Sequence, residues 1–181
     1  PNMVGMAAGY DKNAECLRAL GSFGFGHIEV GTVTFEKQPG NPRPRIYRYK
    51  DEHAIINRLG FNNDGAQAMS ERLARHPSPG KRQVPIGINI GKTKTVPLEK
   101  AVEDYLHTYH LLSDYADYFA INVSSPNTPD LRKLQGEHYL SDLLGQLVHA
   151  NRERSKKLGC PRIPLLLKIA PDLSYHEIDS I

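Results

Sequence analysis

Cysteine is scarce in this sequence: Cys16 and Cys160 are the only two among 181 residues, and no Cys-x-x-Cys pair occurs. Two cysteines so far apart do not indicate a disulfide framework, and they fit a reducing compartment. No apolar run approaches the length of a membrane span, and no signal peptide is visible. The formal charge is only +3 without a block of lysine and arginine, which argues against a nucleic-acid partner.

Length and composition are those of one globular domain. Hydrophobic residues make up 39% of the chain and charged residues 24%, which are ordinary values for such a domain. The chain begins with Pro1 rather than methionine and stops at Ile181, just inside a predicted helix. We therefore expect residues 1–181 to be a piece of a longer protein, with no separate second domain.

Apolar patterns divide the chain into alternating strands and helices. Short β-favouring runs predict strands, and apolar residues at helical spacing predict helices between them. The expected strands cover residues 3–9, 27–30, 84–90, 118–123 and 163–169, and the expected helices cover residues 13–20, 64–76, 98–118 and 140–158. Residues 45–57 predict a hairpin-like excursion, and Ser174 with Glu177 predicts the capping box of a further helix.

Strands that alternate with helices imply a parallel sheet, which leaves two architectures. An open dinucleotide-binding sheet would carry Gly-x-Gly-x-x-Gly after its first strand, but that position here reads Ala8-Gly9-Tyr10-Asp11-Lys12. A glycine-rich run at residues 21–26 follows a helix and is interpreted as an ordinary loop. In a barrel, functional residues come from the ends of several strands, and polar residues follow every strand predicted here. We therefore predict an α/β fold of the (β/α)8 TIM barrel type, with about the first half present.

The clearest strand end follows residues 118–123, where Asn122, Ser125 and Asn127 surround Pro126. Proline has no N–H for the sheet, so the chain must leave the strand there. Taken alone, such a run is often just a turn, but other strand ends in the chain look the same. Together they supply amides, lysines and hydroxyls: Lys12, Thr32, Asn57, Asn62, Asn89, Asn122, Ser125, Asn127 and Lys168.

These side-chain types limit the kinds of site that the strand ends could form. Without clustered carboxylates or histidines, neither a metal site nor a two-carboxylate hydrolase is expected. Converging carboxamides suit a planar ligand with alternating donors and acceptors, such as a pyrimidine or a flavin ring. The lysines suit anionic charge, such as a substrate carboxylate or a reduced flavin.

Six segments resemble, in order, the motifs of the dihydroorotate dehydrogenase family, and six in register are a specific match over essentially the whole chain. They are Ala7-Ala8-Gly9-Tyr10-Asp11-Lys12, Ile28-Glu29-Val30-Gly31-Thr32-Val33-Thr34, Asn57-Arg58-Leu59-Gly60-Phe61-Asn62-Asn63, Gly87-Ile88-Asn89-Ile90-Gly91-Lys92, Asn122-Val123-Ser124-Ser125-Pro126-Asn127-Thr128 and Leu167-Lys168-Ile169-Ala170-Pro171-Asp172. The resemblance implies an FMN-dependent barrel that oxidises dihydroorotate to orotate in pyrimidine biosynthesis.

The resemblance also implies a role for each matching residue, with Ser125 as the catalytic base. The residues expected to bind FMN are Ala8, Gly9, Lys12, Thr32, Asn89, Asn122 and Lys168. Those expected to bind dihydroorotate or orotate are Lys12, Asn57, Arg58, Leu59, Gly60, Phe61, Asn122 and Asn127. No metal is expected.

Ser125 indicates the class within the family. Members of class 2 carry serine at this position, use a quinone and lie at a bacterial or mitochondrial inner membrane, whereas members of class 1 carry cysteine. In the implied mechanism Ser125 takes a proton from C5, hydride moves from C6 to the flavin, and a quinone reoxidises the flavin. A serine needs help to act as a base, and without an adjacent histidine or aspartate a water relay is expected. The quinone and membrane contacts are expected in a segment outside this chain.

Alternatives remain. A class 1 enzyme or another FMN-dependent pyrimidine oxidoreductase is the nearest, and Ser125 argues against both. A catalytically silent binding barrel is the non-enzyme alternative, against which Lys12, Ser125 and Lys168 argue. Barrels typically bind phosphate with loops after strands 7 and 8, so we predict that these 181 residues alone bind FMN weakly or not at all.

Overall fold

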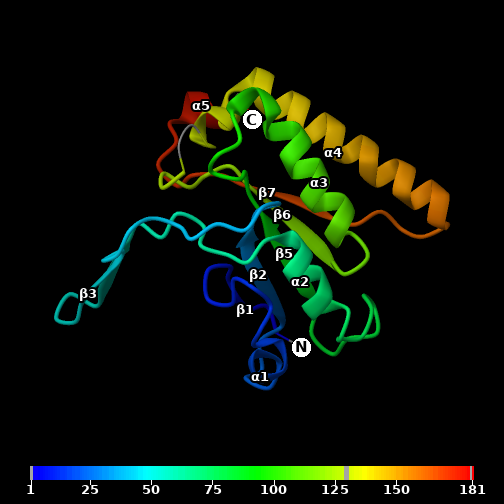
Figure 1. Ribbon diagram of the computed structural model, residues 1–181, viewed down its shortest axis with the longest axis horizontal. Helices are drawn as coiled ribbons and strands as arrows, with labels where there is room; N and C mark the ends of the chain where they lie inside the picture. Colours follow the sequence, from blue (N-terminus) through cyan, green and yellow to red (C-terminus); the bar gives the residue numbers. More distant parts are fainter. Residues whose placement is uncertain (1, 129–130, 180) are drawn as a thin grey trace.

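The computed structural model describes residues 2–128, 131–179 and 181, and it shows a parallel sheet with helices packed along it (Figure 1). The strands are β1 (Gly5–Met6), β2 (His27–Val33), β5 (Ile86–Ile90), β6 (Tyr118–Asn122) and β7 (Leu165–Lys168). They are hydrogen-bonded in that order, and every neighbouring pair is parallel. A doubly wound sheet reverses its strand order at a switch point. The unreversed order among the described residues is that of a barrel wall.

Helices connect the strands and cover the sheet. They are α1 (Leu17–Gly21), α2 (Ala66–Leu73), α3 (Ala101–Leu112), α4 (Glu137–Leu158) and α5 (Tyr175–Asp179), with 3-10 turns η1 (Leu98–Lys100) and η2 (Leu131–Gln135). α3 packs against α2 and α4, so these three helices form a continuous layer (Figure 1). Gly159 caps the carboxyl end of α4, and its left-handed φ of +60° is a conformation that glycine adopts without strain.

The core lies between the sheet and this helical layer. All five residues of β5 are buried, as expected for a parallel strand that is covered on both faces. Tyr105 and Tyr109 of α3 are fully buried in the same core. Asn89 is the polar exception within β5, and a fully buried amide must find hydrogen-bond partners. Its partners identify the site described below.

The expected excursion at residues 45–57 is a hairpin of β3 (Ile46–Tyr49) and β4 (Ala54–Asn57), paired antiparallel with Ile46 opposite Asn57. It extends away from the sheet, on the side opposite α4 (Figure 1). All residues of both strands are exposed.

The first helix is shorter than predicted, because it begins at Leu17 rather than at residue 13. The carboxylate of Asp11 accepts the backbone N–H groups of Glu15 and Cys16, both at 2.8 Å. Ala14 has a positive φ of 59°, which a helix does not allow. Residues 11–16 therefore form a tight turn instead of the first helical turn.

The helix predicted over residues 98–118 is also shorter, since α3 ends at Leu112. Asp117 lies in the segment between this end and β6, and its carboxylate accepts the N–H of Ile86 at 2.8 Å and of Gly80 at 3.1 Å. It also pairs with Arg82 at 2.8 Å. These contacts hold the residues before β6 against the loop that precedes β5. The predicted capping box is confirmed, because Ser174 N donates to the Glu177 carboxylate at 2.7 Å and Glu177 N donates to Ser174 Oγ at 3.3 Å.

Candidate functional site

A cavity of about 400 Å³ lies where the carboxyl ends of the strands meet the loops that follow them. Most of the residues predicted for the site line this one cavity: Ala8, Gly9, Lys12, Thr32, Asn57, Leu59, Gly60, Phe61, Asn122, Ser125, Asn127 and Lys168. They come from segments spread over most of the chain, and the parallel strands bring them together at the carboxyl end of the sheet. Asn89 and Arg58 do not line the cavity.

Three buried side chains at neighbouring strand ends form one hydrogen-bonded network. Thr32 of β2, Asn89 of β5 and Asn122 of β6 are each at most 4% exposed. Thr32 Oγ1 donates to Asn89 Oδ1 at 2.6 Å, and Asn122 Nδ2 donates to Thr32 Oγ1 at 3.1 Å and to Asn89 Oδ1 at 3.2 Å. Asn122 Oδ1 accepts from the N–H and the hydroxyl of Ser124, each at 3.1 Å. Asn89 therefore does not reach the cavity, but its hydrogen bonds hold Thr32 and Asn122, which line it.

Thr32 reaches this network because the β2–β5 register shifts between Gly31 and Val33. Gly31 has a φ of +106°, and a Cβ there would lie 2.4 Å from the carbonyl oxygen of Asn89. Only glycine fits so close to the neighbouring strand without strain.

The loop that carries Lys12 is attached to the end of β2. Gly9 N donates to Gly31 O at 2.8 Å, and Gly31 N donates to Asp11 O at 3.0 Å. With the Asp11 carboxylate holding Glu15 N and Cys16 N, residues 9–16 are fixed at both ends.

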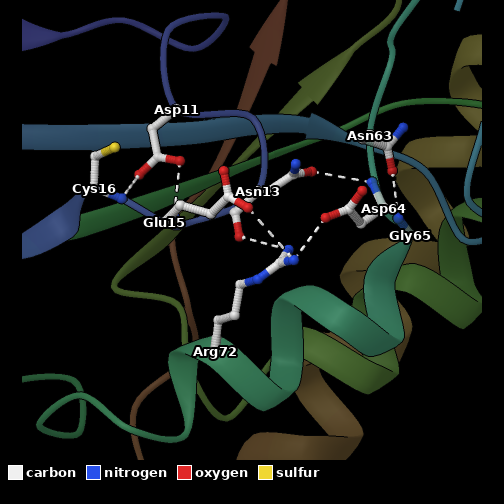
Figure 2. Close-up of polar contacts among 8 residues, drawn as sticks. All are labelled: Asp11, Asn13, Glu15, Cys16, Asn63, Asp64, Gly65 and Arg72. Atoms are coloured by element: carbon white, nitrogen blue, oxygen red, sulfur yellow. Dashed lines mark hydrogen bonds and ion pairs between the residues drawn. The ribbon is translucent and has the colours of Figure 1, made fainter. Parts of the chain in front are cut away.

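Figure 2 shows how the same loop contacts the start of α2. Asp64 N donates to Asn13 Oδ1 at 3.0 Å, and Arg72 Nη1 donates to Asn13 O at 3.3 Å. Arg72 also pairs with Asp64 at 2.6 Å and with Glu15 at 3.5 Å. Exposed ion pairs of this kind contribute little stability individually. Their effect here is to hold the loop that carries Lys12 against α2.

Lys12 lies close to a second cation, Arg45. It also lines a second hollow of about 790 Å³, together with Arg43 and Arg45. Burial lowers the pKa of Lys12 below its ordinary value of 10.5, and the nearby charge of Arg45 lowers it further. Two cations held together in a partly desolvated place favour a bound anion such as a carboxylate.

Of residues 57–61, all but Arg58 line the cavity. The Arg58 guanidinium instead donates to Pro44 O, from Nε at 3.1 Å and from Nη2 at 2.9 Å. Asn41 Nδ2 donates to Arg58 O at 3.0 Å and to Asn127 O at 3.4 Å, so it joins this rim to the loop after β6.

Ser125 and Asn127 lie in the loop after β6. Asn127 N donates to Ser125 Oγ at 3.3 Å. Among the described residues, which leave out positions 129 and 130, no carboxylate or imidazole is hydrogen-bonded to the Ser125 hydroxyl. Lys168, the last residue of β7, lies opposite Asn122 in the register of the sheet.

The cavity is also lined by residues that were not predicted as site residues: Ser124, Pro126, Arg132 and Pro171. Arg132 is the most informative of them. Its Nε donates to Ser124 O at 3.1 Å, and its Nη1 pairs with Asp172 at 3.1 Å, which joins the loops after β6 and β7. Arg132 lies in η2 rather than at a strand end, so the strand-end pattern carried no signal for it.

The cavity has the chemistry to hold a flat heteroaromatic ring. Its volume falls within the range of about 300–1,000 Å³ that is usual for small-molecule sites. Ala8 and Gly9 form a wall with almost no side chains, where a ring can approach the backbone, and hydroxyl, amide and ammonium groups surround it. The described residues contain no group of three or more His, Cys, Asp or Glu that could hold a metal ion.

Comparisons of the sequence and of the structure with known proteins all point to one family. The family model described as dihydroorotate dehydrogenase matches residues 1–181. Proteins named dihydroorotate dehydrogenase (quinone) from Acidithiobacillus ferrooxidans and Thermobifida fusca are 53% and 51% identical, over 99% and 100% of this chain but only 49% and 47% of their own lengths. A crystal structure of the Eimeria tenella protein, titled DHODH in complex with ferulenol, superposes with a TM-score of 0.86 at 39% identity, covering 98% of this chain and 51% of that one.

These likenesses and the unreversed strand order confirm the predicted fold, since the chain matches about half of a (β/α)8 barrel. The chain spans about half the length of the curated relatives it matches.

Proposed function

The chain belongs to the dihydroorotate dehydrogenase family, whose members depend on a flavin, and from this premise we propose that the full-length protein oxidises dihydroorotate to orotate. FMN is the proposed hydride acceptor and a quinone the final acceptor, in the biosynthesis of pyrimidines. We propose residues 1–181 as the N-terminal half of a single FMN-binding barrel.

One observation carries the proposal. Lys12, Ser125 and Lys168 come from segments far apart in the sequence, yet they line one cavity with Asn122 and Asn127. Two cations, two amides and a hydroxyl around a cavity of about 400 Å³ match the needs of an acidic pyrimidine beside a flavin.

The proposed FMN site consists of Ala8, Gly9, Lys12, Thr32, Asn89, Asn122 and Lys168. When bound there, FMN would supply the acceptor for the hydride from C6 of the substrate. The Lys168 ammonium provides positive charge where negative charge develops. Thr32 and Asn122 present polar groups from the wall, and Asn89 holds them in place.

The proposed substrate site lies between Lys12 and the loop after β6. The Lys12 ammonium pairs with the substrate carboxylate, and the amides of Asn57, Asn122 and Asn127 bind the pyrimidine. Leu59, Gly60 and Phe61 shape the rim. Arg58, which is turned to Pro44, acts on this rim through its backbone, since its carbonyl accepts from Asn41.

Ser125 is the proposed base. Its Oγ takes the proton from C5, and the N–H of Asn127, at 3.3 Å, stabilises the negative charge that grows on Oγ as its own proton leaves. With no carboxylate or imidazole bonded to Ser125 among the described residues, that proton passes to water.

Serine at position 125 and relatives named for a quinone both support class 2. We therefore propose that the full-length protein lies peripherally on a bacterial or mitochondrial inner membrane, where its quinone is dissolved. None of the described helices is long and apolar enough to cross a bilayer.

The test is to purify the full-length protein and record its visible spectrum. We expect a flavin spectrum that is bleached by anaerobic dihydroorotate and restored by a soluble quinone. A colourless protein, or a flavin that dihydroorotate leaves oxidised, would contradict the proposal. Restoration by fumarate or a nicotinamide instead of the quinone would assign the protein to another class.

A further inference from the structure

Glu29 is a charged, half-buried residue of β2, and the proposed mechanism does not use it. It lies two positions before Gly31, on the strand next to β5. Its Oε1 accepts from Asn89 Nδ2 at 2.8 Å, and its Oε2 accepts from the Tyr118 hydroxyl at 3.3 Å. Glu29 is half-buried, and the partial burial of a carboxylate costs less when its oxygens are hydrogen-bonded, as both are here.

The contact with Asn89 determines which way that amide faces. A carboxylate can only accept hydrogen bonds, so the Nδ2 side of Asn89 must point toward Glu29. Asn89 Oδ1 then points the other way, and it accepts from Thr32 Oγ1 at 2.6 Å and Asn122 Nδ2 at 3.2 Å. If the amide turned over, its Nδ2 would face the Asn122 Nδ2 donor and its Oδ1 would face the Glu29 carboxylate, which can only accept.

We propose that Glu29 is a positioning residue of the flavin site, which acts through Asn89 to orient Thr32 and Asn122. The inference rests on the proposed function, because it concerns the same site. Glu29 itself does not line the cavity, so its effect on a ligand is indirect.

Tyr118 supports Glu29 from the other side. Burial raises the pKa of Tyr118, and the neighbouring charge of Glu29 raises it further, so the phenol stays protonated and donates. Each carboxylate oxygen thus has its own donor, from β5 and from β6 respectively. Glu29 is held by the two strands whose ends carry Asn89 and Asn122.

The first experiment separates hydrogen bonding from volume. In the full-length protein, Glu29→Met keeps a side chain of similar length but removes the acceptor, whereas Glu29→Gln keeps an acceptor for Asn89 and can donate to Tyr118. We expect the FMN dissociation constant to rise about tenfold or more in Glu29→Met, since it leaves the Nδ2 group of the buried Asn89 without its acceptor. In Glu29→Gln we expect a rise of no more than about threefold. Glu103→Gln, on the exposed face of α3, is the matched control and should leave the FMN dissociation constant unchanged.

A second experiment applies if Glu29→Met does not fold. Tyr118→Phe leaves Asn89 bonded to Glu29, but in Glu29→Gln/Tyr118→Phe the new amide has no Tyr118 hydroxyl to receive its N–H, so only the contact with Asn89 orients it. We expect each single variant to raise the FMN dissociation constant by no more than about threefold and the double variant to raise it by about thirtyfold, above the roughly ninefold that two independent effects would give. In the flavin-free protein, the side-chain amide NMR signals of Asn89 and Asn122 should shift in the double variant and not in Glu103→Gln.

The outcomes distinguish the two proposals. A wild-type protein without a flavin, or one that dihydroorotate does not reduce, counts against the proposed function. A wild-type protein that behaves as proposed, with Glu29→Met and the double variant binding FMN as tightly and with unshifted amide signals, overturns the role of Glu29 alone.

Discussion

A serine hydroxyl is a weak base at neutral pH, so Ser125 depends on its surroundings. General-base catalysis typically contributes about 10²–10⁴ in rate. We expect Ser125→Ala to lower the rate of flavin reduction by dihydroorotate by at least about 10²-fold while FMN remains bound. Stopped-flow absorbance of the reductive half-reaction measures this directly. Ser78→Ala, which replaces an exposed serine, is the control. Turnover close to wild type in Ser125→Ala would show that Ser125 is not the base.

The lowered pKa of Lys12 predicts how substrate affinity depends on pH. Burial and the charge of Arg45 lower that pKa, so the free protein loses the Lys12 proton at a lower pH than an exposed lysine does. Affinity for the anionic substrate should therefore fall as the pH rises through a value below the ordinary 10.5. The measurement is KM for dihydroorotate as a function of pH.

Arg45→Gln tests the cause of that shift. Removing the like charge should move the alkaline rise in KM to higher pH, while burial keeps it below the ordinary lysine value. An unchanged midpoint would show that Arg45 does not act on Lys12. In Lys12→Gln the alkaline rise should vanish, with KM high throughout.

At the scale of elements, Asn151 joins α4 to the segment that enters β7. Its side chain is 4% exposed, its Nδ2 donates to Ile163 O at 2.7 Å, and its Oδ1 accepts from Ile163 N at 3.0 Å. We expect Asn151→Ala to lower the free energy of unfolding by about 2–4 kcal/mol, because it leaves two buried backbone groups unpaired. Urea denaturation measures this, with the exposed Arg152→Ala as control. A loss below about 1 kcal/mol would mean that water replaces the amide.

At the scale of the whole molecule, the sheet formed by the described residues has two free edges. Within that part of the chain, β1 pairs only with β2, and β7 only with β6. Unpaired edges are templates for association with other chains, and the hairpin adds exposed Ile55 and Ile56. We expect the 181-residue chain expressed by itself to aggregate and to bind FMN far more weakly than the full-length protein. Light scattering and flavin absorbance after gel filtration test this, and a monomer that keeps its flavin would contradict it.

Much of the fold could be predicted from the sequence, because the spacing of apolar side chains shows where many of its strands and helices lie. The apolar run of β5 and the helical spacing of α4 identify their elements because side-chain periodicity reports burial directly. The predicted ends of helices were less accurate where side-chain hydrogen bonds, rather than apolar spacing, decide the backbone conformation. The Asp11 carboxylate binds the N–H groups of Glu15 and Cys16 and so holds a turn where apolar spacing predicted a helix.

The sequence by itself determined which residues follow each strand, because breaking residues such as Pro126 act on their own neighbours. It therefore indicated the residue types of the site, from Lys12 to Lys168. Only the tertiary structure decided that the strands run without reversal, that Arg132 enters the cavity, and that Glu29 orients Asn89. Those outcomes depend on contacts between segments tens of residues apart, as in the 60-residue separation of Glu29 and Asn89. Such contacts exist only once the sheet has formed.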